Sequence, residues 1–470
     1  MNKQLIQGLL AVVGIGLIIG ITSAFLSFYS ILINISILLP IIILTIKSPH
    51  KWGLLWGLFP IIVVITAFIG YPKGEILGAD APLHIAIYYI IACFVVFKSL
   101  LIRKSTFYLP INLKWLLLFL GISFFSLLLN YDGLKGLIYW SAWAFYFFIV
   151  LIMVNSITNW DLFVRIVKIK IWSSAIISLW GIIGFVFLGR IDTNPLSIVY
   201  GFEMCDRNLM AAYLLDSFFM SLMIGLKSEK VTDNKILYLI FSIIILICII
   251  YTFSRSTFIA IVIGLIFLTH LFSKSRFKMV RATIILLILA TIIINISPQL
   301  KERLYVAYLS VKSPHDLTYD GARKIILITN WNIAIKNFVF GVGMGNLWDH
   351  YWQNYPSNLH IPSNPNLSSY SQQTHSPHNI YLRILEETGI FGLLSFCLFL
   401  IYSLKEVRKA IKLKMEHDWN IFLKTFYAIL FSYIFTFLFD EYLVNIYLWF
   451  FIGLFSILIV LPQRLPKVSK

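Results

Sequence analysis

The residues best suited to chemistry lie at one boundary between a polar segment and an apolar helix. The stretch THSPHNIYLRILEETGIFGLL, residues 374–394, carries two histidines, an arginine and two glutamates. Imidazole is the side chain whose unperturbed pKa suits proton transfer near neutral pH, so His378 is the candidate general base, with His375 beside it as a supporting residue. The alternative is that His378 only caps a helix or lies at a membrane interface.

The same stretch predicts a local geometry. Ser376 is the expected N-cap and Pro377 the expected first helical residue, which puts the candidate base in the first helical turn. The polar residues that follow share one helical face at i, i+4 and i+8: Asn379, Arg383 and Glu387. We expect all three to support the site. The alternative for the arginine and the glutamate is an internal salt bridge that joins helices.

Two arginines stand where apolar segments meet polar ones, on the same predicted side of the membrane. Arg207 lies in DRNLMAAYLL and Arg255 in SRSTFIAIVIG. A guanidinium at such a boundary is costly unless it is paired, and its planar fork matches phosphate oxygens. The two residues therefore indicate an anion site, with Arg323 as a further candidate. Snorkelling to lipid headgroups is the alternative.

A diphosphate on a membrane lipid is the expected anion, because two arginines can neutralise a diphosphate leaving group without a metal. The sequence contains no Asp-x-Asp pair, no HExxH motif and no Walker-type glycine loop. We therefore expect neither a metal site nor a cofactor.

The segment before this boundary favours a sugar ligand. From residue 353 to residue 379 the chain has no Lys, Arg, Asp or Glu, but many Asn, Gln, Ser, Tyr and His. Amide and hydroxyl groups can hydrogen-bond sugar hydroxyls without the desolvation cost of a full charge. Aromatic rings nearby offer apolar faces to a pyranose: Trp348, Tyr351, Trp352, Tyr355 and Tyr370. A glycan is the expected ligand, and a merely solvated loop is the alternative.

The elements that must hold these residues are membrane helices. Of 470 residues, 59% are hydrophobic and 13% charged, with a mean hydropathy of +0.86, which a water-soluble domain could not cover. Runs long enough to cross about 30 Å of hydrocarbon recur along the chain. We expect an all-α polytopic membrane protein with about twelve to fourteen transmembrane helices, near 5–25, 29–46, 53–70, 84–102, 115–130, 137–156, 166–188, 208–226, 236–253, 256–272, 279–297, 379–404, 420–438 and 442–461.

Basic residues set the expected orientation. With both termini cytoplasmic, the inner loops, tails and adjoining helix ends hold 26 of the 38 Lys and Arg, which is the positive-inside bias. The net charge of +17 therefore needs no nucleic acid, since clusters at 273–281 and 405–414 are expected on the anionic cytoplasmic leaflet.

Four regions follow from this topology. They are the N-terminal helices (1–190), the helices with the boundary arginines (191–297), an extracytoplasmic loop (298–378), and the C-terminal helices with a cytoplasmic tail (379–470). The loop is far longer than an ordinary connection, which is typical of a functional loop. Within it, ARKIILITNWNIAIKNF predicts an amphipathic helix on the membrane surface or against the bundle, followed by the turn-rich GVGMGN.

Over roughly residues 200–460 the chain resembles the O-antigen ligase and O-antigen polymerase superfamily of bacterial membrane glycosyltransferases. Four motifs carry the resemblance: DRNLMAAYLL, SRSTFIAIVIG, GARKIILITNWNIAIKNFVFGVGMGN and HNIYLRILEETGIFGLL. The last is the most specific, because it joins His-Asn to a hydrophobic helix and to Glu-x-Gly-x-x-Gly, here Glu387, Gly389 and Gly392.

The resemblance implies a metal-independent, inverting transfer from an undecaprenyl-diphosphate-linked glycan donor. It implies that Arg207 and Arg255 hold the diphosphate, that Arg323 contributes, and that His378 activates the hydroxyl of a glycan or lipid-linked acceptor. The implied location is the bacterial inner membrane, with the site facing the periplasm or the exterior.

Composition rich in Ile, Phe, Lys and Asn is similar to that of polysaccharide-locus polymerases. We therefore expect polymerisation of lipid-linked repeat units into O-antigen or capsular-type polysaccharide, with a chain-length regulator as a further partner. The alternative is a ligase that passes the glycan to lipid A core, or a relative that passes it to protein. A lipid-linked glycan flippase or transporter is a weaker alternative, because the charges gather at one boundary. Asp216 is the one midspan carboxylate that would suit a transporter, and a pairing with a neighbouring arginine is the other interpretation of this residue.

Overall fold

A computed structural model describes residues 108–131, 134–188, 207–228, 231, 234–252, 254–272, 280–281, 284, 305, 321–355, 377–413, 417–439 and 446–464. The predicted spans before residue 108 lie outside the described residues, as do His375, Tyr370 and all of the predicted span 279–297 except 280–281 and 284.

The described residues are 87% helical and include no strand. Every predicted span within the described ranges forms a helix: α5 (Ile111–Leu129), α6 (Leu134–Ser156), α7 (Trp160–Leu188), α8 (Arg207–Lys227), α9 (Lys235–Tyr251), α10 (Arg255–Leu271), α16 (Ile380–Lys412), α17 (His417–Thr436) and α18 (Ile446–Arg464). Of these, α5, α6, α7, α8 and α16 are long and apolar enough to cross a membrane. The fold class is therefore that of an all-α, multi-pass membrane protein, as predicted, and the total number of spans stays a prediction.

Two helices extend furthest beyond their predicted ends. The helix α7 begins six residues early, at Trp160, because the Asn159 side chain accepts a hydrogen bond from the Leu162 amide at 2.8 Å and so caps the helix. The helix α16 continues to Lys412, through residues whose basic side chains suit a helix C-terminus.

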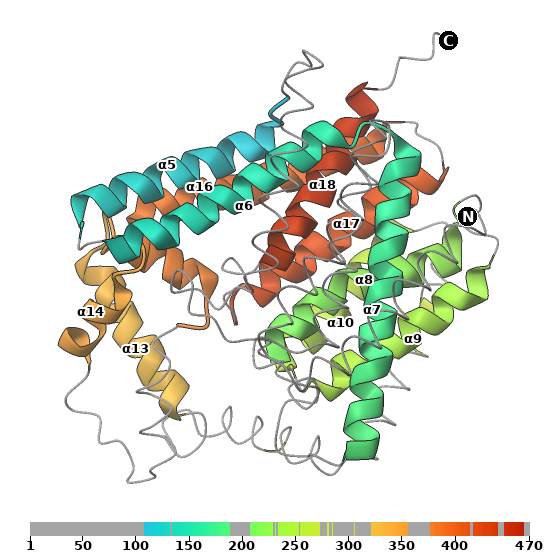
Figure 1. Ribbon diagram of the computed structural model, residues 1–470, viewed down its shortest axis with the longest axis horizontal. Coiled ribbons are helices and arrows are strands. Elements are labelled where there is room, and N and C mark those ends of the chain that lie inside the picture. Colours follow the sequence, from blue (N-terminus) through green and yellow to red (C-terminus); the bar gives the residue numbers. More distant parts are fainter. Residues whose placement is uncertain are drawn as a thin grey trace, which may run out of the picture.

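The helices pack as two groups that α17 joins (Figure 1). Along one side α16 packs against α5, while α6 packs against α18. On the other side α8 packs against α7 and α9. The helix α17 contacts α8, α10 and α16, and it therefore connects the two groups.

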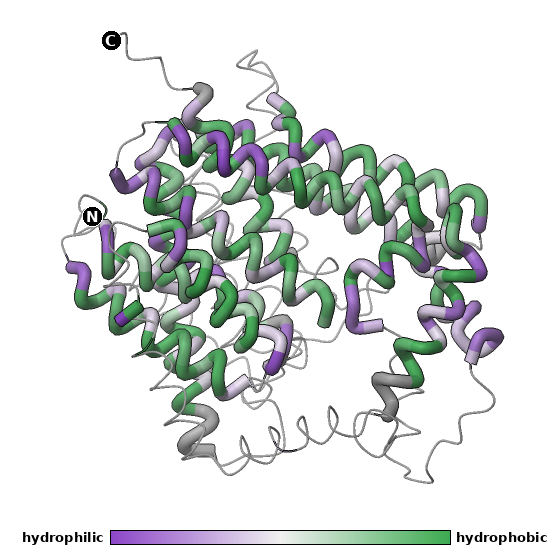
Figure 2. Tube along the Cα trace, turned by 180° about the vertical axis from the view of Figure 1, so that it is seen from behind, coloured by the Kyte–Doolittle hydropathy of each residue, from purple (hydrophilic) through white to green (hydrophobic). Residues whose placement is uncertain are grey.

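The predicted loop helix is confirmed as α13 (Gly321–Lys336), which packs against α16 and is followed by α14 (Leu347–Tyr351) and the 3-10 turn η3 (Trp352–Asn354). In Figure 1, α13 and α14 lie beside the ends of α5 and α6. Figure 2 shows apolar residues along the bundle helices and hydrophilic residues at helix ends and around α14. This distribution fits helices that cross an apolar layer and a polar segment at its edge.

Candidate active site

The predicted start of the last motif's helix is wrong by three residues. The first helical residue of α16 is Ile380, not Pro377, and the N-cap is Asn379, whose side chain accepts a hydrogen bond from the Leu382 amide at 3.0 Å. Both serine and asparagine are good N-caps, and here the asparagine provides the cap. His378 therefore precedes the helix, and Asn379 serves as its cap.

The backbone of His378 is held in an uncommon conformation. Its φ of 48° lies in the left-handed region, which few non-glycine residues adopt, although histidine does so more often than most. The helix that follows is fastened to α17, because the Ile380 amide donates to the Phe437 carbonyl at 2.9 Å and the Tyr381 hydroxyl donates to the Ile434 carbonyl at 2.9 Å. Such conformations persist where surrounding contacts fix them, and they gather at functional sites.

Arg383 and Glu387 form an internal salt bridge, which was the alternative interpretation. Arg383 Nη2 lies 3.3 Å from Glu387 Oε1 and donates to the Tyr139 hydroxyl of α6 at 2.6 Å. Glu387 is fully buried and its Oε1 also accepts from the Gly345 amide at 3.3 Å. The pair thus joins α16 to α6 and to the loop after α13.

The helix α16 is broken at Gly389, where φ is 69° and ψ is −171°. The backbone of the segment after α13 fills this break: Ile390 N donates to Phe338 O at 2.8 Å, Val342 N to Glu386 O at 2.7 Å, and Gly343 N to Glu387 O at 3.0 Å. These bonds satisfy carbonyl and amide groups that the interrupted helix leaves without helical partners.

Glycines make this close approach possible. Besides Gly389, Gly341, Gly343 and Gly345 all have positive φ, and the predicted turn-rich GVGMGN is confirmed. A Cβ on Gly341 would lie 2.6 Å from the Glu386 carbonyl oxygen. The Glu-x-Gly-x-x-Gly motif therefore has a structural role: its first glycine lets a loop backbone pack directly on the helix.

The helix α5 completes this junction. The Ser126 hydroxyl lies 2.5 Å from the Phe340 carbonyl and 2.7 Å from the Glu387 carbonyl. The Asn130 side chain donates to Gly341 O at 3.2 Å. Three segments distant in sequence are thereby held together: α5, the glycine-rich segment after α13, and α16, the helix that follows His378.

The two boundary arginines occupy equivalent places. Arg207 is the first residue of α8 and Arg255 is the first residue of α10. The side chain of Arg255 is exposed. The hydroxyl of Ser254 caps α10 by accepting from the Thr257 amide at 3.5 Å. Helix N-termini carry partial positive charge, so anions are favoured at both places.

Other predicted site residues are less closely defined. Arg323 lies in the first turn of α13, and its side chain, like that of Arg207, lies outside the described part. Trp348 and Trp352 are exposed, as a sugar-stacking role requires. Tyr351 is fully buried, so it offers no face to a sugar, and burial raises its pKa to about 12.

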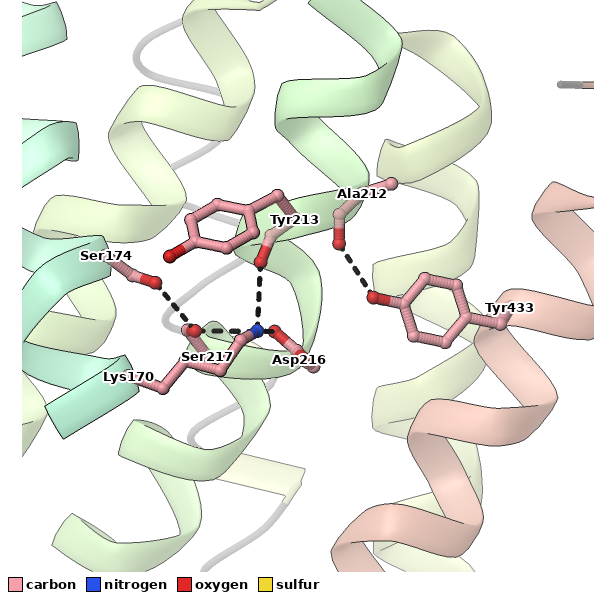
Figure 3. A network of polar contacts seen from close by, with 7 residues as sticks. All are labelled: Lys170, Ser174, Ala212, Tyr213, Asp216, Ser217 and Tyr433. Carbon is pink, nitrogen blue, oxygen red and sulfur yellow. Dashed lines mark hydrogen bonds and ion pairs between the residues drawn. The ribbon is translucent and has the colours of Figure 1, made fainter. Parts of the chain in front are cut away.

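The partner of Asp216 is a lysine, and not the neighbouring arginine that was one of the two interpretations of this residue. Asp216 forms a buried ion pair with Lys170 of α7, and Ser217 beside it lies 2.8 Å from the hydroxyl of Ser174 (Figure 3). The pair joins two neighbouring helices inside the bundle. Within the described ranges no group of three or more His, Cys, Asp or Glu side chains is arranged to hold a metal ion.

Sequence reasoning missed several polar residues that fix these elements. They are polar side chains inside or at the ends of apolar spans, and this placement was the available signal: Ser126, Asn130, Tyr139, Lys170, Ser432 and Tyr433. Each one bonds a different helix or loop, which a single sequence does not identify.

Comparison with known proteins identifies one matching segment. Residues 240–397 match a protein-family model described as O-Antigen ligase. The segment contains Arg255, Arg323, His378 and the glycine junction, while Arg207 lies before it. No curated protein matches the chain.

Proposed function

We propose that the chain is a member of the O-antigen ligase and polymerase superfamily, a family of glycosyltransferase-type enzymes, and that it polymerises undecaprenyl-diphosphate-linked repeat units into O-antigen or capsular-type polysaccharide. The substrates of the family are lipid-linked glycans and its setting is the membrane. The proposed location is the bacterial inner membrane, with the site on its outer face.

One observation carries this proposal. The matched segment includes both Arg255, at the start of α10, and His378, just before α16, and both helices contact α17. The candidate anion-binding arginine and the candidate proton acceptor thus lie at the starts of two helices that pack on the same helix. This is the combination that transfer from a lipid diphosphate requires.

In the proposed reaction, His378 takes the proton of the acceptor hydroxyl while that oxygen attacks the anomeric carbon of the donor sugar. The new carbon–oxygen bond forms as the bond to the diphosphate breaks, and attack from the opposite face inverts the anomeric configuration. A positioned base of this kind contributes about a hundred- to ten-thousand-fold in rate. Asn379 contributes by fixing the helix start that follows the base.

The leaving diphosphate carries away the electron pair and gains negative charge. In the proposal Arg207 and Arg255 neutralise this charge, and Arg323 contributes from α13. Preorganised charge of this kind accounts for much of the catalysis in comparable sites. The sugar–diphosphate bond supplies the driving force, so the reaction needs neither ATP nor, in this proposal, a metal ion.

Ligation is the second candidate, because the matching family model is described as O-Antigen ligase. A ligase would use the same donor and pass the glycan to lipid A core, and a related activity would pass it to protein. A polymerase would be expected to work beside a polysaccharide chain-length regulator. Composition similar to polysaccharide-locus polymerases is the reason for placing polymerisation first.

The test uses purified full-length protein in detergent with a lipid-diphosphate-linked repeat unit and product analysis by gel mobility. A ladder of longer glycans from this donor alone supports the polymerase. Extension that occurs only when lipid A core is added would make the protein a ligase. Movement of the lipid-linked glycan across vesicles without any new glycosidic bond would overturn the enzyme assignment.

A further inference from the structure

Two consecutive residues of α17 reach two different helices. The Tyr433 hydroxyl donates to the Ala212 carbonyl of α8 at 2.8 Å (Figure 3), and the Ser432 hydroxyl lies 2.9 Å from the Ala260 carbonyl of α10. Ser432 also lies 3.1 Å from the Ala428 carbonyl of its own helix, so its single proton is shared. Both side chains are buried.

The two acceptors lie at the same distance from the two boundary arginines. Ala212 follows Arg207 by five residues, and Ala260 follows Arg255 by five residues. At 1.5 Å per residue, each arginine lies about 7.5 Å along its helix beyond the contact with α17. The end of α10 lies near the start of α17, where Lys424 Nζ is 4.7 Å from the centroid of the Phe272 ring, so α10 runs antiparallel to α17. Because the two donors are neighbours in sequence, this arrangement places the starts of α8 and α10, with their arginines, at similar depth.

The candidate base falls in the same layer. The helix α17 runs antiparallel to α8, since its start is bonded to the end of α8 through Ser228 and Asp418 at 3.2 Å. Phe437 lies four residues beyond Tyr433, or about 6 Å along the axis, and its carbonyl accepts a hydrogen bond from the amide of Ile380. Residues 432–437, at the end of α17, therefore form hydrogen bonds to α8, α10 and α16, near the starts of these helices, where the candidate residues lie.

The helix α8 is also held by α7, one turn beyond its contact with α17. Lys170 of α7 pairs with Asp216, one turn after Ala212, and Figure 3 shows Lys170 and Tyr433 approaching this turn from different helices. A buried ion pair in an apolar bundle is costly to break. The axial position of α8 is thus fixed from both α7 and α17.

We propose that Ser432 and Tyr433 are positioning residues that set the axial register of α8 and α10, so that Arg207 and Arg255 reach the same depth beside His378. This inference rests on the proposed function, in which the two arginines hold one diphosphate. Neither positioning residue touches the substrate.

The test removes each hydroxyl with little change in shape. Tyr433→Phe and the double variant Ser432→Ala/Tyr433→Phe are compared with Thr425→Val. The buried hydroxyl of Thr425 donates to the Ile421 carbonyl of its own helix. Hydrogen bonds between membrane helices are modest, so we expect a rise in KM for the lipid-diphosphate donor of about threefold for the single variant and about tenfold for the double variant. Ser432→Thr should keep the KM of the wild type.

A merely structural role predicts a different result. It would lower the amount of active enzyme, and hence the apparent kcat, to the extent that the melting temperature falls, while KM stayed constant. An unchanged KM in the double variant would overturn the proposal. So would an equal rise in KM in Thr425→Val.

A second readout does not depend on catalysis. Spin labels on two exposed residues, Ile259 of α10 and Leu438 after α17, report the register of the two helices. The distance distribution should shift or broaden in the double variant and stay unchanged in Thr425→Val; an unchanged distribution in the double variant overturns the register claim. If the wild type forms no glycosidic bond, the proposed function fails while this distance still tests the register.

Discussion

Replacement of Gly389 by alanine should separate the two halves of α16 from the loop that packs on the break. A Cβ at this position would lie 2.6 Å from the Phe340 amide nitrogen and closer still to the Val339 carbonyl. These are backbone atoms, so no side chain can rotate away. The backbone at φ 69° and ψ −171° lies in a region that essentially only glycine occupies, which costs any residue with a Cβ about 1–3 kcal/mol.

The expected loss of stability follows from the contacts that the added Cβ would displace. Displacing the loop strains the packing by about 1–3 kcal/mol and weakens the Ile390–Phe338 hydrogen bond by about 1 kcal/mol. With the cost of the backbone conformation, Gly389→Ala should destabilise the protein by about 3–7 kcal/mol. We expect a large fall in the yield of folded protein and in transfer activity.

Gly121 supplies the matched control. It lies in α5, and a Cβ added there would meet no other atom within 4 Å, so Gly121→Ala should be neutral or slightly stabilising, by up to about 1 kcal/mol. Thermal unfolding of both variants in detergent, followed by tryptophan fluorescence, makes the comparison. Equal melting temperatures for the two variants would refute the account of the glycine junction.

Three further predictions concern the diphosphate site and the membrane. Arg255→Lys and Arg207→Lys should each lose most transfer activity while inserting normally, because an ammonium lacks the bidentate fork; near-normal product from both would favour lipid snorkelling. Cysteines at Asn358 and Ser369 should react with an impermeant thiol reagent in intact cells, after outer-membrane permeabilisation if there is one, and labelling only after lysis would reverse the topology. The exposed Trp331 of α13 should be quenched by brominated lipids in reconstituted vesicles, and fluorescence insensitive to them would remove α13 from the membrane surface.

The bundle helices were predictable from sequence because their signal is local. In a membrane, long apolar runs form helices because their backbone groups must bond one another, and all of the predicted spans in the described ranges are helical. The turns at GVGMGN were equally local, since glycines there supply the positive φ that the turns need. Arg207 and Arg255 were expected at the starts of helices for the same reason.

The remainder depends on partners that are distant in sequence. The start of α16 at Ile380 includes a hydrogen bond to Phe437, and no pattern near Ser376 or Pro377 reveals that acceptor. The break at Gly389 is filled by a loop from before the helix, so glycine alone does not predict it. Lys170 sits inside an apolar span and is explained only by Asp216 on the next helix.

The most direct measurement of the central claim compares wild-type protein with His378→Ala. Both are purified and given a lipid-diphosphate-linked glycan and an acceptor, with excess EDTA and no ATP. The wild type should form a glycosidic bond, whereas His378→Ala should lose about a hundred- to ten-thousand-fold in rate and still bind the donor. His375→Ala should cost less. Full transfer activity in His378→Ala would contradict the base assignment, and a strict need of the wild type for a metal ion would contradict the metal-free mechanism.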